Sequence, residues 1–283
     1  MNPVLADLIT VLQLERLELN LFRGVSRDIG TPQVFGGQVL GQALFAASAT
    51  VPPERTVHSL HAYFLQRGDV NAPIIYEVDR SRDGGSFSSR RVVAIQHGQQ
   101  VFHMSASFQN QQPGLEHQSP MPTVPLPESL TDIGQLVAQA GDITPELRGL
   151  FARQLPIEFR AVNPLEMMSG EVRTAECSFW FRAVDTMPDD VVLHRCLLAY
   201  ASDFYLLRTA VQPHGIPFPS TKLRLATIDH AMWFHRPLRI DDWLLYSTDS
   251  PSASGSRGLA RGAIFNRAGQ LVASVAQEGL VRA

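Results

Sequence analysis

The chain carries one sequence pattern twice, and this repeat limits the possible folds more than any other feature. His61-Ala62 of the first copy aligns with His230-Ala231 of the second, and the alignment continues with slips of one residue. The paired segments are VHSLHAYF (57–64) with ATIDHAMW (226–233), IIYEVD (74–79) with LLYSTD (244–249), and GGSFSSRRV (84–92) with SGSRGLARG (254–262). Each copy then closes with a long strand pattern behind a glycine-containing hairpin turn. Such self-similarity predicts two copies of one structural unit.

Each copy also has a helical segment in front of its strands. These segments are VFGGQVLGQALFAASAT from Val34 and DVVLHRCLLAYASDFYLL from Asp190. The second is apolar nearly all round, which is typical of a helix enclosed by protein. One long buried helix followed by several antiparallel strands, present twice, predicts an α+β fold. In this fold two antiparallel sheets each wrap around a long helix, which is the tandem or double hotdog arrangement.

The repeat divides the chain into three parts. We expect an N-terminal hotdog repeat over residues 1–110 and a C-terminal hotdog repeat over residues 156–283. Between them, residues 111–155 contain NQQPGLEHQSPMPTVPLPESL, whose proline and glutamine content predicts a linker. Two short helices are expected within this linker, at about 133–139 and 144–153.

Composition and charge exclude several classes of partner. The formal charge of −3 and the isoelectric point near 6.3 argue against a nucleic-acid or anionic-membrane partner, because either normally needs a basic face. No apolar run approaches the roughly 20 residues of a membrane span. The first residues, MNPVLADLITVLQLERLEL, have apolar side chains at helical spacing but include Asp7 and Glu15. They predict an amphipathic helix rather than a signal peptide.

Neither a metal site nor a bound cofactor is expected. The two cysteines, Cys177 and Cys196, fit neither a disulfide framework nor a zinc site. Histidine pairs such as 58 and 61, or 230 and 235, are an odd number of residues apart and so point to opposite faces of a strand. No dinucleotide or phosphate loop is present. With free cysteines, and with a C-terminal LVRA that is no peroxisomal signal, we expect a cytoplasmic protein.

Seven segments of the chain resemble the acyl-CoA thioesterase II family. They are VFGGQVLGQAL, VHSLHAYFL, GGSFSSRRV, LAYASDFYLL, ATIDHAMWFHRP, WLLYS and VAQEGLVR, and the resemblance runs from about residue 5 to residue 282. Members of this family are double-hotdog hydrolases of fatty acyl-CoA that associate into dimers or tetramers. The resemblance implies a catalytic trio of an aspartate, a Ser or Thr, and a glutamine. The matching residues here are Asp203, Thr227 and Gln277.

The residues themselves support two of these three assignments. Asp203 lies on an apolar helix without a basic neighbour one turn away, so its carboxylate either ends the helix at the surface or takes part in catalysis. Gln277 follows Leu271, Ala273 and Val275 at alternate positions, so its amide ends an apolar row and needs a partner. Thr227 alone is an ordinary strand residue. A water held between the three side chains would satisfy all of them.

Thr227 belongs to the stretch LRLATIDHAMWFHRP (223–237), which predicts one strand with unusually many polar groups. Period-two alternation places Thr227 on one face with Asp229, Ala231, Trp233 and His235. The repeat alignment gives the first-copy counterparts of the trio as His58, either Ala106 or Ser107, and a position near Ala46. We therefore expect one active site per pair of copies, with His58 as a secondary catalytic candidate.

The expected reaction is hydrolysis of acyl-CoA, with medium- to long-chain fatty acyl-CoA as the substrate class. Asp203 would act as the general base for a water that Thr227 and Gln277 position, and the water would attack directly. A backbone N–H near Gly36-Gly37 could bind the oxyanion. A covalent mechanism through Thr227 is the rival. A hotdog enoyl-CoA hydratase and a non-catalytic acyl-CoA binding protein remain alternative functions.

Overall fold

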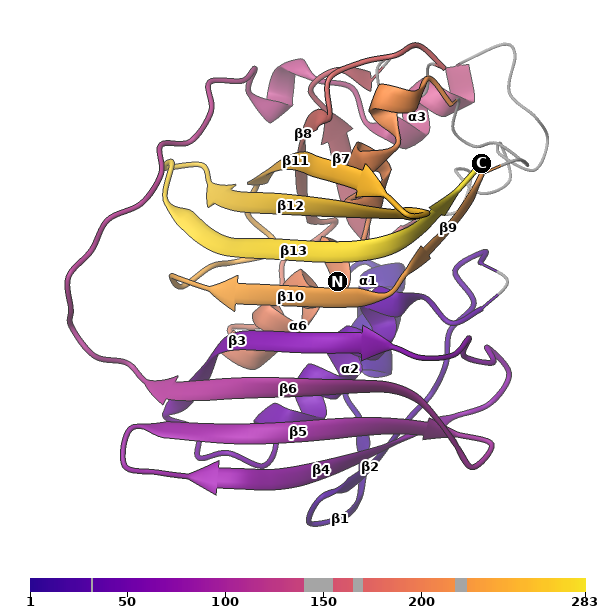
Figure 1. Cartoon of the computed structure of the whole chain (residues 1–283). Coiled ribbons are helices and arrows are strands. Elements are labelled where there is room, and N and C mark those ends of the chain that lie inside the picture. The colour runs from indigo at the N-terminus through magenta and orange to yellow at the C-terminus, as the bar shows by residue number, and fades with distance from the viewer. Residues whose placement is uncertain (32, 140–154, 165–169, 217–222) are drawn as a thin grey trace.

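The computed structural model describes the chain except residue 32 and residues 140–154, 165–169 and 217–222. The described strands form one 13-stranded antiparallel sheet, and the two long central helices cover one face of it (Figure 1). The N-terminal copy contributes α1 (Pro3–Leu12), β1 (Glu15–Glu18), β2 (Leu21–Gly24), α2 (Gly36–Ser48), β3 (Arg55–Phe64), β4 (Ile74–Asp83), β5 (Phe87–Gln96) and β6 (Gln99–Asn110). The C-terminal copy contributes β7 (Ile157–Ala161), β8 (Glu176–Ala183), α6 (Val191–Ser202), η2 (Leu207–Ala210), η3 (Gln212–His214), β9 (Arg224–Thr227), β10 (Asp229–Phe234), β11 (Leu244–Ser254), β12 (Arg257–Asn266) and β13 (Leu271–Arg282).

The predicted duplication is confirmed, with one difference in how the sheets are arranged. The strand order is β1-β2-β4-β5-β6-β3 in one copy and β10-β13-β12-β11-β8-β7 in the other, with β9 beside β13. β3 and β10 pair with each other in antiparallel register, from Ser59 opposite Trp233 to Tyr63 opposite Asp229. The two expected sheets are therefore joined edge to edge, and the edges that would otherwise be exposed are paired at the centre of the molecule.

The two central helices pack against each other through glycine. A Cβ atom on Gly37 would lie 2.3 Å from the carbonyl oxygen of Tyr200, and one on Gly41 would lie 3.0 Å from that of Cys196. Moving four residues forward along α2 therefore moves four residues backward along α6, so the helices are antiparallel. Their backbones approach so closely that no side chain fits between them at these positions. Both helices are buried along most of their length, as the sequence predicts for α6.

The linker packs on the outer face of the C-terminal copy. Residues 111–126 are extended, followed by η1 (Pro127–Ser129) and α3 (Ile133–Gln139). The Trp180 indole N–H donates to the carbonyl of Pro125 at 2.9 Å, and Met121 and Val124 cover a small cluster around Trp180. The expected helix at 133–139 is confirmed, and the one at 144–153 lies outside the described residues. No helix in the described part of the chain is long and apolar enough to cross a membrane.

The stretch 223–237 is two strands rather than the single strand that its composition predicts. Ala231 of β10 pairs with Ala276 of β13, whereas Thr227 of β9 pairs with Gly279. Between these two pairs, the chain that runs from β9 to β10 has three residues (228–230), whereas β13 has two (277–278). Ile228 is therefore one extra residue, a β-bulge. A shift of one residue moves a side chain to the opposite face of a sheet. Thr227 therefore faces inward, and the prediction that it shares a face with Trp233, whose side chain is exposed, is wrong.

We expect Gly37→Ala to destabilise the protein, because the added methyl group overlaps the Tyr200 carbonyl and forces α2 away from α6. Overpacking of this kind costs about 1–3 kcal/mol, which lowers the melting temperature by several degrees. Thermal unfolding followed by circular dichroism measures the change. Gly114→Ala is the matched control, since nothing lies within 4 Å of a Cβ atom there. Equal melting temperatures for the two variants would contradict the close packing.

Candidate active site

Asp203 occupies the C-cap of α6. The helix ends at Ser202, and the chain turns away at Tyr205, which has a left-handed backbone (φ 62). A bulky residue with positive φ is rare and costs conformational energy, but the Tyr205 ring offsets this by packing among Phe159 and Phe179. Asp203 thus ends its helix, as one of the two sequence interpretations holds. It does so at a cavity wall inside the protein rather than on the outer surface.

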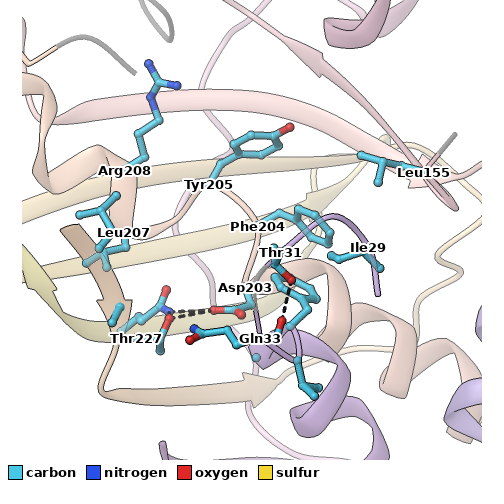
Figure 2. A pocket seen from close by; sticks show the side chains of 16 residues that line it. Ile29, Thr31, Gln33, Leu155, Asp203, Phe204, Tyr205, Leu207, Arg208 and Thr227 are labelled. Carbon is cyan, nitrogen blue, oxygen red and sulfur yellow. Dashed lines mark hydrogen bonds between the residues drawn. The ribbon is translucent and has the colours of Figure 1, made fainter. Parts of the chain in front are cut away.

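The three predicted site residues lie together at this point, and Figure 2 shows Asp203 and Thr227. The Gln277 side-chain amide donates to Asp203 Oδ1 at 2.8 Å and to Thr227 Oγ1 at 2.6 Å, and the Thr227 hydroxyl donates to Asp203 Oδ1 at 3.3 Å. Gln277 lies on the buried face of β13 with Ala273 and Val275, as predicted, whereas Leu271 packs in the outer cluster. The three side chains thus bond directly to one another at the wall of a cavity that all of them line.

The surroundings of Asp203 favour a carboxyl group that is reluctant to lose its proton. Burial raises the pKa of Asp203 above its ordinary value, while hydrogen bonds from Gln277, the Gly37 backbone N–H and Thr227 act in the opposite direction. The carboxylate also lies at the negative end of the α6 dipole and beside the positive N-terminus of α2. A carboxylate with a raised pKa is a stronger base than an ordinary aspartate, which suits it to accept a proton from water.

The glycine pair at the start of α2 lies directly beside Asp203. A Cβ atom on Gly36 would lie 2.7 Å from Asp203 Oδ2, so glycine permits this close approach. The backbone N–H of Gly37 acts on the carboxylate and lowers the pKa of Asp203. That a backbone N–H near Gly36-Gly37 binds the substrate oxyanion stays a prediction.

Two cavities meet at the trio and extend in different directions. The first, of about 310 Å³, runs beneath the C-terminal copy between mostly apolar side chains: Ile29, Val34, Phe35, Leu155, Phe204, Tyr205, Leu207 and Leu225. The second, of about 490 Å³, runs along the N-terminal copy past Phe64, Gln66, Arg67, Gly68 and Val101. Both are lined by Gly36 and Thr227, and Asp203 and Gln277 line the first. A substrate with one apolar and one polar end could therefore place its middle at Asp203.

Beneath the trio lies a pair of side chains that the sequence did not single out as functional. The His230 ring nitrogen Nε2 is 2.9 Å from the Ser202 hydroxyl, which precedes Asp203. Burial lowers the pKa of His230 to about 3, so the ring is neutral. Its Nδ1 atom and Gln277 Oε1 are both buried without a hydrogen-bond partner among the described residues. The contact between His230 and Ser202 holds the C-terminal end of α6 in place. A single histidine in a strand gives little indication of this role in the sequence.

His58 lies far from this site. It is the residue at which the register between β3 and β6 shifts, and its Nε2 atom is 2.8 Å from the Ser107 hydroxyl. Phe64, which contacts the site, is six residues further along β3, about 20 Å away. Burial and the nearby Arg195 lower the pKa of His58. His58 lines neither of the two cavities, so the structure does not support it as a candidate base.

The first-copy counterparts of the trio also need correction. His61 is exposed whereas His230 is buried, so the alignment that pairs them is out of register. Matching the bulges at His58 and Ile228 instead places Val57 and Ala106 at the positions of Thr227 and Gln277. The C-cap of α2, which corresponds to Asp203, is Ala49 rather than a residue near Ala46. The inference that the first copy lacks the trio is unchanged.

Known proteins resemble the chain over its whole length. The family described as "Acyl-CoA thioesterase N-terminal domain" matches residues 25–109, and the one described as "Acyl-CoA thioesterase" matches residues 147–280. Acyl-CoA thioesterase 2 of Haemophilus influenzae is 44% identical over 283 residues, which is 100% of this chain and 99% of that protein. The chain belongs to the acyl-CoA thioesterase II family. The resemblance inferred from the seven sequence segments is thereby confirmed.

Solved structures of this family have the same fold. The acyl-CoA thioesterase II TesB2 of Mycobacterium marinum is 43% identical, with a TM-score of 0.80 over 97% of this chain and 98% of that one. A protein of unknown function with a hot dog fold from Alicyclobacillus acidocaldarius matches with a TM-score of 0.77 at 19% identity, over 98% of both chains. The second likeness shows the fold alone. Together they confirm the predicted tandem hotdog fold of the thioesterase.

The pH dependence of the thioesterase should report on Asp203. A general base acts when it is deprotonated, so kcat/KM rises as pH rises through the pKa of Asp203. Because that pKa is raised, the acidic limb lies at higher pH than for an ordinary aspartate. Gln277→Met removes a hydrogen bond that lowers this pKa, so we expect the limb to move to still higher pH. Rate profiles of the variant, of the exposed control Gln99→Met and of the unmodified protein test this. If the acidic limb of the pH–rate profile lies at the same pH in Gln277→Met and in the unmodified protein, Gln277 does not affect the group that titrates.

Proposed function

We propose that the protein hydrolyses medium- to long-chain fatty acyl-CoA by direct attack of a water molecule that Asp203 deprotonates. Family membership supports the thioester hydrolase activity, since the H. influenzae relative is named an acyl-CoA thioesterase. The observation that supports the mechanism is the carboxylate that Thr227 and Gln277 hold at the wall of the apolar cavity, next to Gly36 and Thr227, which line both cavities. In this proposal the site needs no metal or other cofactor. Among the described residues, no group of His, Cys, Asp or Glu is placed to hold a metal ion.

Each step of the proposed reaction uses a group already in place. The water oxygen attacks the thioester carbonyl carbon while its proton passes to Asp203, and a tetrahedral oxyanion forms. The intermediate collapses by breaking the carbon–sulfur bond, which releases CoA as the thiolate and the fatty acid. Asp203 then returns its proton to the products. In this proposal Thr227 and Gln277 hold the base in place, since both donate to the same carboxylate oxygen, Oδ1.

The first test replaces the base without changing its shape. We expect Asp203→Asn to lower the rate of free-thiol release from acyl-CoA by about 10²-fold or more, the usual scale for loss of a general base. Asp249→Asn on β11, an exposed carboxylate paired with Arg261, is the matched control and should keep full activity. His58→Gln should also remain active, because that histidine lies far from both cavities.

Two outcomes would overturn this mechanism. If Asp203→Asn releases thiol at the normal rate while His58→Gln does not, the chemistry lies elsewhere in the thioesterase. An acyl adduct on Thr227, detected by mass spectrometry of enzyme quenched during turnover, would replace direct water attack with covalent catalysis. Consumption of enoyl-CoA without thiol release would favour a hydratase, and tight binding without turnover would favour a binding protein.

We further propose how the substrate lies in the two cavities. The fatty acyl chain takes the apolar cavity beneath the C-terminal copy, because burial of methylene groups there is favourable. The pantetheine arm takes the cavity along the N-terminal copy, whose lining includes Arg67. This side chain is exposed and makes neither a hydrogen bond nor an ion pair with any described residue, so it is free to meet a phosphate of CoA. The thioester then lies at Asp203.

A variant in the acyl cavity and a variant in the pantetheine cavity should change the kinetics in different ways. Ile29→Trp narrows the apolar cavity from a loop position that is half-buried. It should lower kcat/KM for long acyl chains by about tenfold more than for short ones, the scale of rejecting one or two methylene groups. Arg67→Gln should instead raise KM by a similar factor at every chain length. Free-thiol release across a series of chain lengths distinguishes them. Reversed profiles would mean that the substrate lies in the opposite direction.

A cytoplasmic homodimer or homotetramer is the assembly we propose for this chain. Cys177 and Cys196 are not joined in a disulfide, which is compatible with a reducing compartment. On the outer face of the central strands, Tyr63 and Trp233 expose 49% and 37% of their surface, which is unusual for aromatic side chains that have no partner to cover them. Light scattering gives the molar mass that tests the assembly.

A further inference from the structure

A third cavity lies at the end of the helix pair opposite to Asp203. It has a volume of about 380 Å³ and opens where α2 ends, at Ala49 and Thr50. Its remaining lining is one carboxylate and a set of cationic and apolar side chains: Arg16, Val51, Pro52, Arg55, Arg80, Asp83 and Arg90. Four arginines and one aspartate leave a formal excess of three positive charges. We call this the arginine cavity.

The arginine cavity lies near the position that the active site occupies in the other copy. Ala49 is the counterpart of Asp203, and Ala106 that of Gln277. Arg90 on β5 is paired with Ala106, just as Ala260 on β12 is paired with Gln277. An arginine in the first copy therefore replaces an alanine in the second. The copy that lost the carboxylate carries a buried guanidinium group instead.

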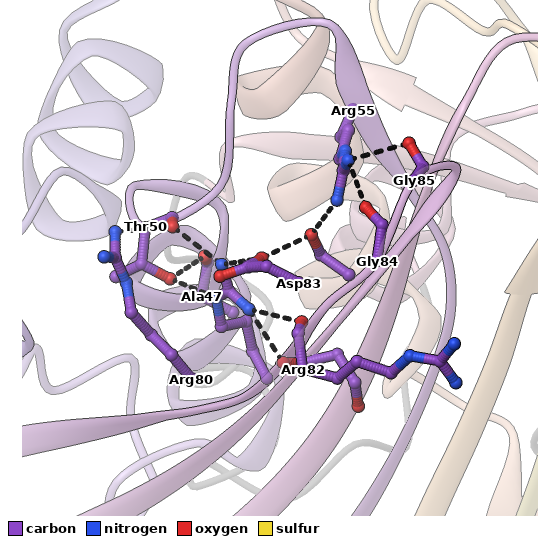
Figure 3. A network of polar contacts seen from close by, with 11 residues as sticks. Ala47, Thr50, Arg55, Arg80, Arg82, Asp83, Gly84 and Gly85 are labelled. Carbon is purple, nitrogen blue, oxygen red and sulfur yellow. Dashed lines mark hydrogen bonds and ion pairs between the residues drawn. The ribbon is translucent and has the colours of Figure 1, made fainter.

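Arg90 and Arg55 both line this cavity, and Figure 3 shows Arg55 bonded to Gly84 and Gly85. Arg90 is 1% exposed, and all five of its N–H groups are used: Nε on the Thr50 hydroxyl, Nη1 on the carbonyls of Arg82 and Ser89, and Nη2 on the Thr50 carbonyl and Asp83. Arg55 bonds Ser88 and the carbonyls of Gly84 and Gly85. These bonds hold the β4–β5 hairpin against the end of α2. They also leave the charge of both arginines in place.

Donors for a ligand remain on the other side chains. Arg80 makes one hydrogen bond, to the Thr50 carbonyl at 2.9 Å, and no ion pair among the described residues. Arg16 uses Nε and Nη2 on the carbonyls of Glu18 and Leu19, which are neutral groups. Arg80 and Arg16 therefore keep N–H groups that can donate to a ligand with several acceptor oxygens.

The charge of the cavity indicates the class of ligand. Asp83 is the only acidic side chain in the lining, and its carboxylate is already occupied by Arg90 and Ser88. The hydrogen bonds from these two residues lower the pKa of Asp83, so it remains charged and leaves the excess at three. Guanidinium groups match the geometry of phosphate oxygens. We propose that the arginine cavity binds a phosphate group, either as inorganic phosphate or as a phosphate monoester of a nucleotide.

Calorimetric titration and thermal unfolding in phosphate-free buffer at constant ionic strength test this inference. Inorganic phosphate should bind saturably, and at about ten times its Kd it should raise the melting temperature by roughly 2–4 °C. Arg80→Gln should weaken binding by about tenfold or more. Arg91→Gln is the matched control, because Arg91 follows Arg90 on β5 but lies on the exposed face of the sheet. This control should bind phosphate like the unmodified protein.

A second probe, adenosine 3′,5′-bisphosphate, distinguishes a site for inorganic phosphate from a site for a nucleotide phosphate. Binding of both probes identifies a site for the phosphate group itself, and binding of the bisphosphate alone identifies a nucleotide site. The absence of saturable binding for either probe overturns the proposal. Binding that is lost in Arg67→Gln but kept in Arg80→Gln also overturns it, because the phosphate is then in the substrate cavity. None of these results depends on thioester hydrolysis, which is measured separately by free-thiol release.

Discussion

The contact between α2 and α6 is the interaction on which both the core and the site depend. Gly37 lies against the carbonyl of Tyr200, three residues before Asp203, so the helix N-terminus of one copy lies beside the carboxylate of the other. The same approach that closes the core brings the Gly37 N–H to Asp203. A larger residue at position 37 would separate the helices and the two halves of the site together. The same residue, Gly37, therefore determines both the packing of the two helices and the electrostatic environment of Asp203.

The two copies keep one architecture but carry opposite chemistry at the ends of this helix pair. One end has a buried carboxylate held by an amide and a hydroxyl, and the other has a buried guanidinium that binds the end of a helix. Each arrangement satisfies polar groups that would otherwise be unpaired in the interior. Both copies belong to one continuous sheet, so the first copy supports the fold although it lacks the three site residues.

Much of this could be predicted from the sequence, because it depends on local patterns. The apolar helices, the hairpin turns before the long final strands and the repeated order of elements all have such patterns, and the structure confirms them. Asp203 and Gln277 could be singled out as polar groups in apolar surroundings. The register could not be predicted, since the bulge at Ile228 leaves no compositional trace yet reverses the face on which Thr227 lies. The pairing of β3 with β10 and the arginine cavity depend on contacts between distant segments.

The cavities that meet at Asp203 are lined by both copies, with Val34, Phe35 and Gly36 on one side and Phe204, Leu225 and Thr227 on the other. For evolution after the duplication, this means that neither copy was free to drift alone. A substitution in the first copy changes the shape of a site whose reactive groups belong to the second, so compensating changes have to arise across the duplication. Exchange of one half between distant relatives would bring together surfaces with separate histories. The activity therefore depends on both copies together, because each contributes part of the cavity wall.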